Sequence, residues 1–162
     1  MRLTKFLLVG LLWSGMAFAD PPQGYPFLGY DAGLKAARES GKPIFLYFGR
    51  YGCAWCDHTN KKTFSDAALK KLYTQNYVLV YVDAESGKRL TLPSGERITE
   101  AELGVRLQAF ATPLFVYLTP TGDKIVQIPG FKTVQDFRDY DRYVRGGHYK
   151  DQTLMEFLGA KS

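Results

Sequence analysis

Two cysteines separated by two residues, placed where a strand-like run gives way to a helix-like one, constrain this chain most. Residues 44–48 are all apolar or aromatic, as in a strand buried on both faces, and Gly49 and Gly52 end the run. Cys53 and Cys56, the only cysteines, follow at the start of a predicted helix. Residues three apart share a helix face, so their sulfurs can form a disulfide. Free N–H groups and the dipole at the helix start favour a reactive Cys53 thiolate.

Three other uses of the cysteine pair fit the sequence less well. A c-type haem site needs a histidine directly after the second cysteine, and Asp57 occupies this position. A zinc site usually needs four ligands, and His58 is rotated about 140° from Cys53 on a helix. A structural disulfide that closes so short a loop stabilises a fold only weakly. A redox-active pair is the favoured interpretation, and we expect no metal and no cofactor.

The N-terminus has the pattern of a secretory signal peptide. Arg2 and Lys5 precede an apolar run, and Ala17-Phe18-Ala19 forms a cleavage site of the small-x-small type before Asp20. The apolar run is short and is interrupted by glycine and serine, so it does not span a membrane comfortably. We therefore expect a leader over residues 1–19 and an exported protein, periplasmic or secreted.

The remaining residues, 20–162, have the length and composition of a single globular domain. The whole chain is 46% hydrophobic and 23% charged, which is sufficient for a real core. Without the two basic residues of the leader, the net charge falls from +5 to +3, and no basic stripe indicates nucleic-acid binding. Outside the cytosol disulfides persist, so an exposed dithiol must either act as an oxidant or be kept reduced by a partner.

Apolar runs, turn residues and helix caps predict a central mixed sheet with helices on both faces. The runs 44–48 and 77–82, joined by helical segments, indicate a parallel strand pair. The polar segment 84–98 is predicted to be a surface hairpin, and segments 111–118 and 124–128 to be antiparallel strands. Three helices are predicted with their N-caps: about 32–40 after Asp31, 67–73 after Ser65, and about 100–109 after Thr99. Three more are expected to begin at Cys53, to begin at Thr133, and to lie around residues 154–158.

This order of elements resembles the thioredoxin fold over roughly residues 40–145. More closely, the chain is similar to the exported thioredoxin-like group that includes the SoxW-type proteins and the C-terminal domain of the transmembrane reductase DsbD. A CxxC motif followed about 57 residues later by Thr-Pro at a strand start is far more specific than CxxC alone. The strings that carry the resemblance are Lys42-Pro43-Ile-Phe-Leu, Cys53-Ala-Trp-Cys56, Thr63-Phe-Ser-Asp66, Ala111-Thr112-Pro113-Leu-Phe-Val, Gly122-Asp and Pro129-Gly130-Phe131.

The resemblance implies a substrate-binding groove beside the cysteines. It implies a cis Thr112–Pro113 peptide bond against the two sulfurs, although cis bonds are rare even before proline. It also implies that Thr112 offers its backbone to an extended substrate segment and that Gly130 allows a partner to approach closely. Tyr51 and Trp55 flank the site, and such amphipathic aromatics can form a substrate platform or shield the site from solvent.

The sequence departs from thioredoxin around the motif. Thioredoxin has Trp-Cys-Gly-Pro-Cys, whereas Gly52 precedes the motif here and Ala54-Trp55 lies within it. Tyr47 stands where thioredoxin carries a buried aspartate, and no lysine is found near Leu79, where thioredoxin has one. Proton transfer to the resolving thiol must therefore differ, and Tyr47, Asp57 and water are the candidates. We interpret Asp57 itself as a solvated helix residue.

The resemblance implies thiol–disulfide exchange, with Cys53 as the nucleophile and Cys56 as the resolving cysteine. We expect a monomeric reductase of exported proteins with disulfides, recharged by a membrane electron donor of the DsbD or CcdA kind. A dithiol oxidase or disulfide isomerase of the same fold is one alternative. A non-enzymatic module that binds polypeptides beside Pro113 is another.

Overall fold

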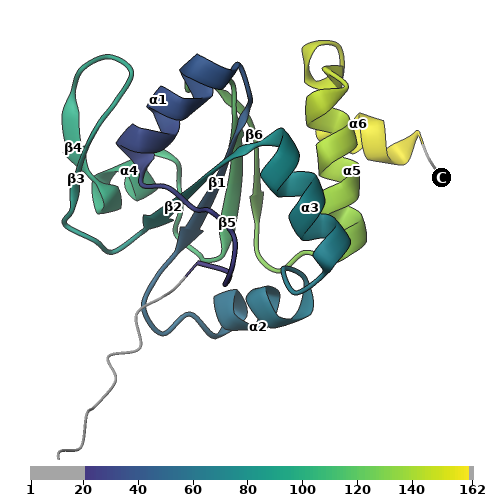
Figure 1. Ribbon diagram of the computed structural model, residues 1–162, viewed down its shortest axis with the longest axis horizontal. Coiled ribbons are helices and arrows are strands. Elements are labelled where there is room, and N and C mark those ends of the chain that lie inside the picture. Colours follow the sequence, from purple (N-terminus) through teal and green to yellow (C-terminus); the bar gives the residue numbers. More distant parts are fainter. Residues whose placement is uncertain (1–20, 161–162) are drawn as a thin grey trace, which may run out of the picture.

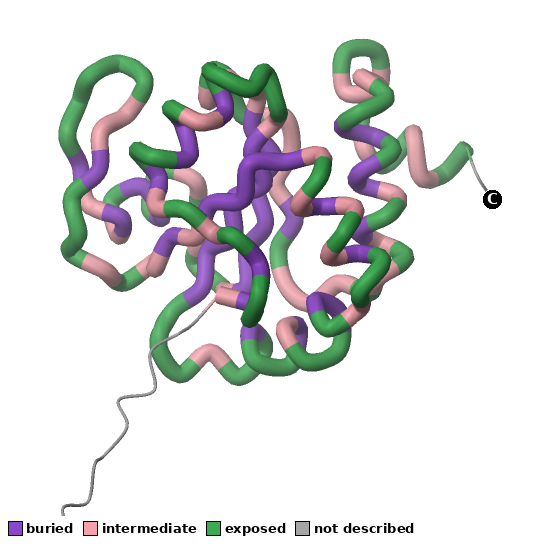
Figure 2. The backbone as a smooth tube through the Cα atoms, viewed as in Figure 1, coloured by how far each residue is buried: buried purple, intermediate pink, exposed green. Residues whose placement is uncertain are grey.

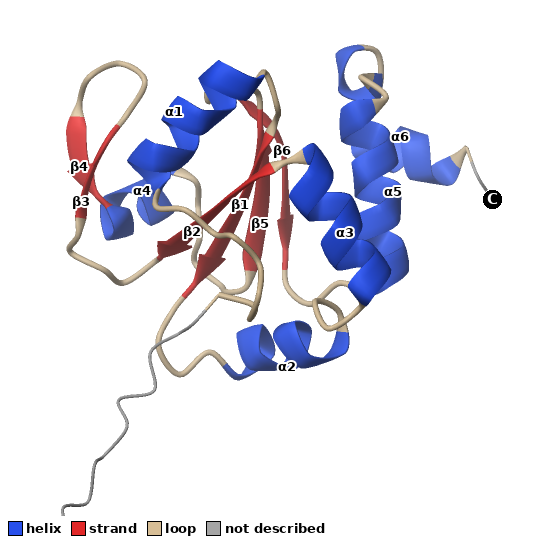
Figure 3. Cartoon of the chain, in the orientation of Figure 1, coloured by secondary structure: helices blue, strands red, loops and turns tan. Residues whose placement is uncertain are grey.

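The computed structural model describes residues 21–160, which form a four-stranded sheet with helices on both faces (Figures 1 and 3). The strand order is β2-β1-β5-β6; β1 pairs parallel with β2 and antiparallel with β5, and β5 pairs antiparallel with β6. The predicted mixed sheet is therefore confirmed. The strands are β1 (Ile44–Gly49), β2 (Val78–Asp83), β5 (Leu114–Leu118) and β6 (Lys124–Pro129). The predicted leader, residues 1–19, lies outside the described residues.

The helices divide between the two faces of the sheet. In Figure 1, α1, α4 and a hairpin lie on one side, α3 and α5 on the other, and α2 crosses one end. The hairpin occupies the segment predicted from its polar composition. The bounds are α1 (Tyr30–Ser40), α2 (Ala54–Lys62), α3 (Ala67–Asn76), β3 (Arg89–Thr91), β4 (Arg97–Thr99), α4 (Glu100–Arg106), α5 (Val134–Arg145), a 3-10 turn η1 (His148–Lys150) and α6 (Leu154–Gly159).

Two predicted N-caps are wrong. Helix α1 begins after Gly29, and the Asp31 carboxylate instead accepts a 2.7 Å hydrogen bond from the backbone N–H of Thr91, in β3. Helix α3 is capped by Asp66 rather than by the neighbouring Ser65. In both cases the side chain of the predicted cap makes another hydrogen bond. Asp31 accepts from Thr91, and the Ser65 hydroxyl donates to a carbonyl of α2. The predicted capping boxes at Thr99 and Thr133 are confirmed.

Strand β1 is buried on both faces and divides two cores (Figure 2). Ile44, Leu46 and Phe48 face an aliphatic core with α1 and α4. Phe45 and Tyr47 face an aromatic core with α3 and α5. The alternation follows from the period of two along a strand, and both sets are apolar because both faces are covered.

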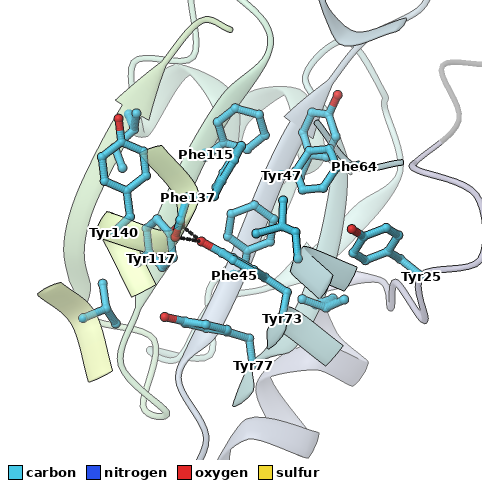
Figure 4. Close-up of a cluster of buried hydrophobic side chains, with 14 of the residues drawn as sticks. Tyr25, Phe45, Tyr47, Phe64, Tyr73, Tyr77, Phe115, Tyr117, Phe137 and Tyr140 are labelled. Carbon is cyan, nitrogen blue, oxygen red and sulfur yellow. Dashed lines mark hydrogen bonds between the residues drawn. The ribbon is translucent and has the colours of Figure 1, made fainter. Parts of the chain in front are cut away.

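Phe45 lies at the centre of the aromatic core (Figure 4). Its ring centroid lies 5.0–6.4 Å from those of six other rings, in the range where aromatic pairs attract beyond simple burial. The six rings belong to Phe64, Tyr73, Tyr77, Phe115, Tyr117 and Phe137.

A buried hydrogen-bond chain joins this core to α5. The Tyr73 hydroxyl donates to the Phe137 carbonyl at 2.8 Å and lies 2.6 Å from the Tyr117 hydroxyl (Figure 4). Because Tyr73 has a single hydroxyl proton, Tyr117 must be the donor in the pair.

We expect Tyr73→Phe to destabilise the protein more than Tyr117→Phe. Removing the Tyr73 hydroxyl leaves the buried Tyr117 hydroxyl without its partner, at a cost of about 2 kcal/mol. Removing the Tyr117 hydroxyl leaves the bond from Tyr73 to Phe137 in place, at a cost of about 1 kcal/mol. Urea unfolding of the two variants measures the difference, and equal losses would contradict the assigned donor.

Helix α4 ends at Arg106, three residues earlier than predicted. Gln108 adopts a left-handed conformation with φ of 55°, and its N–H bonds to the Val105 carbonyl at 3.0 Å. The next N–H, of Ala109, bonds to the Gly104 carbonyl at 2.8 Å. These two bonds form a Schellman motif in which glutamine occupies the position that usually carries glycine.

Gln108→Gly should therefore stabilise the protein. A left-handed residue with a side chain costs about 1–2 kcal/mol, and the greater freedom of glycine in the unfolded chain offsets part of the gain. The expected net effect is about 0.5–1 kcal/mol in thermal or urea unfolding. Gln108→Ala is the control: it keeps the left-handed strain, so an equal gain in this variant would refute the explanation.

Candidate active site at the cysteine pair

A tight turn after β1 delivers the first cysteine to the start of α2. Gly49 ends the strand where any side chain would collide with the Tyr81 hydroxyl. Gly52 has φ of 66°, a conformation that favours glycine, and the Cys53 N–H closes the turn on the Arg50 carbonyl at 3.3 Å. The sequence suggested that Cys53 is the first helical residue of α2. In the structure it is the N-cap, and the helix begins at Ala54.

The two cysteines form a disulfide, with 5.2 Å between their Cα atoms. Their surroundings differ, since Cys56 is 7% exposed and Cys53 is half-buried. The Cys53 sulfur accepts hydrogen bonds from the Cys56 N–H at 3.1 Å and from the Thr112 hydroxyl at 3.2 Å. After reduction, these donors and the N-terminus of α2 would favour the thiolate at Cys53.

Two distant loops complete the surroundings of Cys53. The Thr112–Pro113 peptide bond is cis, and the Thr112 side chain reaches the sulfur. The Gly130 N–H donates to the Pro113 carbonyl at 2.8 Å, which joins the loop after β6 to the loop before β5. Gly130 has φ of 76° and no heavy atom near the place where a side chain would start, so the space above it is open. The structure thus brings together Cys53, Thr112, Pro113 and Gly130 from separate segments.

The two predicted flanking aromatics are exposed. Tyr51 is 63% exposed and Trp55 is 59% exposed, so both rings are available to a ligand. Trp55 lies near His58 and Phe131, with ring centroids at 5.5 and 6.4 Å. Neither His58 nor Phe131 was predicted from the sequence to lie at the site, although the spacing of three residues from Trp55 to His58 on a helix indicates the former.

Phe110 is a further exposed aromatic residue near the site that the sequence did not predict. Its side chain is 81% exposed, an unusual state for phenylalanine. It lies two residues before Thr112, so its Cα is within about 7 Å of the Thr112 Cα. Its position after the turn that ends α4 depends on the Schellman motif, which the sequence did not reveal.

A cavity of about 840 Å³ opens beside the disulfide, and Cys56 and Asn60 line it. The Asn60 side chain accepts a 3.2 Å hydrogen bond from the Tyr47 hydroxyl. Burial raises the pKa of Tyr47 well above its usual value, and nearby Tyr81 and Asp57 raise it further. The phenol therefore stays protonated near neutral pH, so Tyr47 cannot serve as the base that takes the Cys56 proton.

Asp57 is the carboxylate nearest in sequence to the cysteines. It is exposed, lines the same cavity, and pairs with Lys61 at 2.7 Å, which confirms its interpretation as a solvated helix residue. Of the three candidates for proton transfer, Asp57 and water thus remain.

Over residues 21–160, no three cysteine, histidine or acidic side chains are arranged to hold a metal ion. None of the helices in the same part of the chain is long and apolar enough to cross a membrane.

Sequence comparison relates the chain to known proteins. The sequence model of a family described as "Thioredoxin-like domain" matches residues 30–145. An uncharacterized protein of Caenorhabditis elegans is 32% identical over 101 residues, 62% of this chain and 13% of that protein. Spermatogenesis-associated protein 20 of Mus musculus is 30% identical over 101 residues, 62% of this chain and 12% of that protein. The match thus spans about one eighth of the length of these relatives.

Solved structures share the architecture. A thioredoxin-fold protein from Helicobacter pylori superimposes with a TM-score of 0.62 at 23% identity, over 75% of this chain and 80% of that chain. The oxidised C-terminal domain of DsbD from Neisseria meningitidis gives a TM-score of 0.50 at 17% identity, over 70% of this chain and 95% of that chain. The expected resemblance to thioredoxins and to this DsbD domain is confirmed at the level of the fold.

The hydrogen bond from the Thr112 hydroxyl should lower the pKa of the reduced Cys53 thiol. In reduced protein carrying Cys56→Ser, Thr112→Val removes a donor to the thiolate, so the pKa of Cys53 should rise by about one unit. The pH dependence of alkylation by iodoacetamide measures this shift. Thr112→Ser keeps the hydroxyl and should leave the profile in place, and a profile that Thr112→Val does not move would contradict the role of the hydroxyl.

Proposed function

The chain belongs to the thioredoxin-like domain family, and from this we propose that it is an exported thiol–disulfide oxidoreductase that reduces protein disulfides. The observation that carries the proposal is the unequal environment of the two sulfurs. Cys53 is half-buried and receives two hydrogen bonds on its sulfur, whereas Cys56 is buried one turn into the helix. Such a pair separates an attacking thiolate from a resolving thiol.

The reaction proceeds in two exchanges. The Cys53 thiolate attacks one sulfur of a client disulfide, forms a mixed disulfide and expels the other client sulfur as a thiolate. Cys56 then loses its proton to Asp57 or to water, and its thiolate attacks the Cys53 sulfur, which releases the second client thiolate. The client gains two electrons, and the protein is left with the disulfide between Cys53 and Cys56.

The surface around Cys53 supports a polypeptide client. The space above Gly130 is open, and the exposed rings of Tyr51 and Trp55 provide apolar area near Cys53. An extended client segment could pair with the backbone of Thr112 as an added strand.

The reducing direction and the export are further parts of the proposal. The N-terminal pattern around Arg2, Lys5 and Ala17-Phe18-Ala19 supports export to the periplasm or beyond. An exported reductase needs a source of electrons across the membrane, and a donor of the DsbD or CcdA kind supplies it. The protein acts as a monomer.

Replacing each cysteine in turn tests the division of roles. Cys53→Ser should abolish exchange with protein disulfides, whereas Cys56→Ser should accumulate mixed disulfides with clients on non-reducing gels. If Cys53→Ser retains its function in cells, the chain is a polypeptide-binding module and not an oxidoreductase. If Cys56→Ser traps no client, the assignment of the two roles is wrong.

The reduction potential of the pair tests the direction. Equilibration with a dithiothreitol or glutathione couple should give a value near that of thioredoxin, about −270 mV, as expected of a reductase. A value near about −120 mV would identify a dithiol oxidase. Efficient rescue of scrambled disulfides would instead identify an isomerase.

A further inference from the structure

One face of α2, beside the disulfide, combines exposed aromatic rings with positive charge. Trp55, His58 and Lys62 are separated by three and four residues, so they project from the same face of the helix. All three are exposed. Phe131 and Lys132 adjoin them from the loop after β6, and we call these five residues the aromatic–basic face.

The rings of this face form one continuous surface. The Phe131 ring lies 4.9 Å from the His58 ring and 6.4 Å from the Trp55 ring, measured between centroids. The loop that carries Phe131 is held at both ends. The Gly130 N–H bonds to the Pro113 carbonyl at 2.8 Å, and the Thr63 hydroxyl donates to the Lys132 carbonyl at 2.6 Å. The loop that carries Phe131 is therefore fixed both to the Pro113 loop and to the end of α2.

The two lysines of this face, unlike Lys61 and Arg50, have no ion-pair partner among residues 21–160. The one acidic residue of α2, Asp57, pairs with Lys61 on another flank of the helix. Within residues 21–160, neither Lys62 nor Lys132 takes part in an ion pair; Lys132 donates to two backbone carbonyls of its own loop. On the other side of Cys53, by contrast, Arg50 is paired with Glu85 at 3.1 Å.

We propose that the aromatic–basic face is a specificity subsite for acidic client segments. This inference rests on the proposed function and names its substrate class. In an extended client, a side chain near the reactive cysteine packs on Trp55 and Phe131 if it is aromatic or otherwise apolar. An aspartate or glutamate beside it lies against Lys62 and Lys132. Complementary charge at the edge of a contact accelerates encounter and excludes wrong partners, so basic clients are disfavoured.

Trp55 itself provides the readout. It is the only tryptophan outside the predicted leader, so the fluorescence of the mature protein reports on this face alone. The probes are two extended peptides that carry phenylalanine next to a serine in place of cysteine and differ only in flanking aspartates or lysines. We expect the acidic peptide to bind the oxidised protein about three- to tenfold more tightly at low salt, with the difference lost as salt rises.

A charge reversal locates the effect. Lys62→Glu should abolish or invert the ratio of the two affinities. The matched control is Lys42→Glu, which makes the same charge change just before β1, at the end of the strand opposite to the cysteines, and should keep the ratio. Equal binding of both peptides to the natural protein overturns the inference. An unchanged ratio in Lys62→Glu, or no fluorescence response to either peptide, overturns it as well.

The same peptides with their cysteine restored, as disulfides, separate this inference from the proposed function. Exchange at equal rates with acidic and basic disulfides overturns the subsite and leaves the oxidoreductase in place. A charge preference in binding without any exchange overturns the oxidoreductase and leaves a binding face. Faster exchange with the acidic disulfide, reversed by Lys62→Glu, supports both.

Discussion

The rest of the structure depends on the complete burial of β1. Its five residues from Ile44 to Phe48 are each at most 1% exposed, and neighbouring strands bond to both of its edges. Its side chains alternate between two cores, so neither face can shift without opening one of them. The carboxyl end of this strand is therefore a firmly held point of the molecule, and the cysteine motif follows it after one short turn.

From that fixed point the site is assembled out of three segments distant in sequence. The turn after β1 brings Cys53, the loop before β5 brings Thr112, and the loop after β6 brings Gly130. Single hydrogen bonds join them: Thr112 to the Cys53 sulfur, and Gly130 to the Pro113 carbonyl. The sulfur thus gains donors that favour its thiolate after reduction.

The aromatic core affects the chemistry as well as the stability. It buries Tyr47 where thioredoxin has an acid, and burial keeps that phenol protonated. In the proposed mechanism, Tyr47 is therefore not the base that takes the Cys56 proton. The cavity beside Cys56, open to Asp57 and water, takes over this part of the reaction in the proposed mechanism.

The sequence by itself determined the elements whose causes are local. Continuous apolar runs predicted the main strands, and polar composition predicted the hairpin. Thr99 and Thr133 predicted the helices that begin after them, and the cysteine spacing predicted the disulfide. Tertiary structure decided the features in which a distant or competing group wins. Asp31 bonds to a hairpin strand instead of capping α1, and Phe131 joins Trp55 and His58 from another loop. Periodicity and capping act within a few residues of chain, whereas these contacts exist only after the sheet has brought remote segments together.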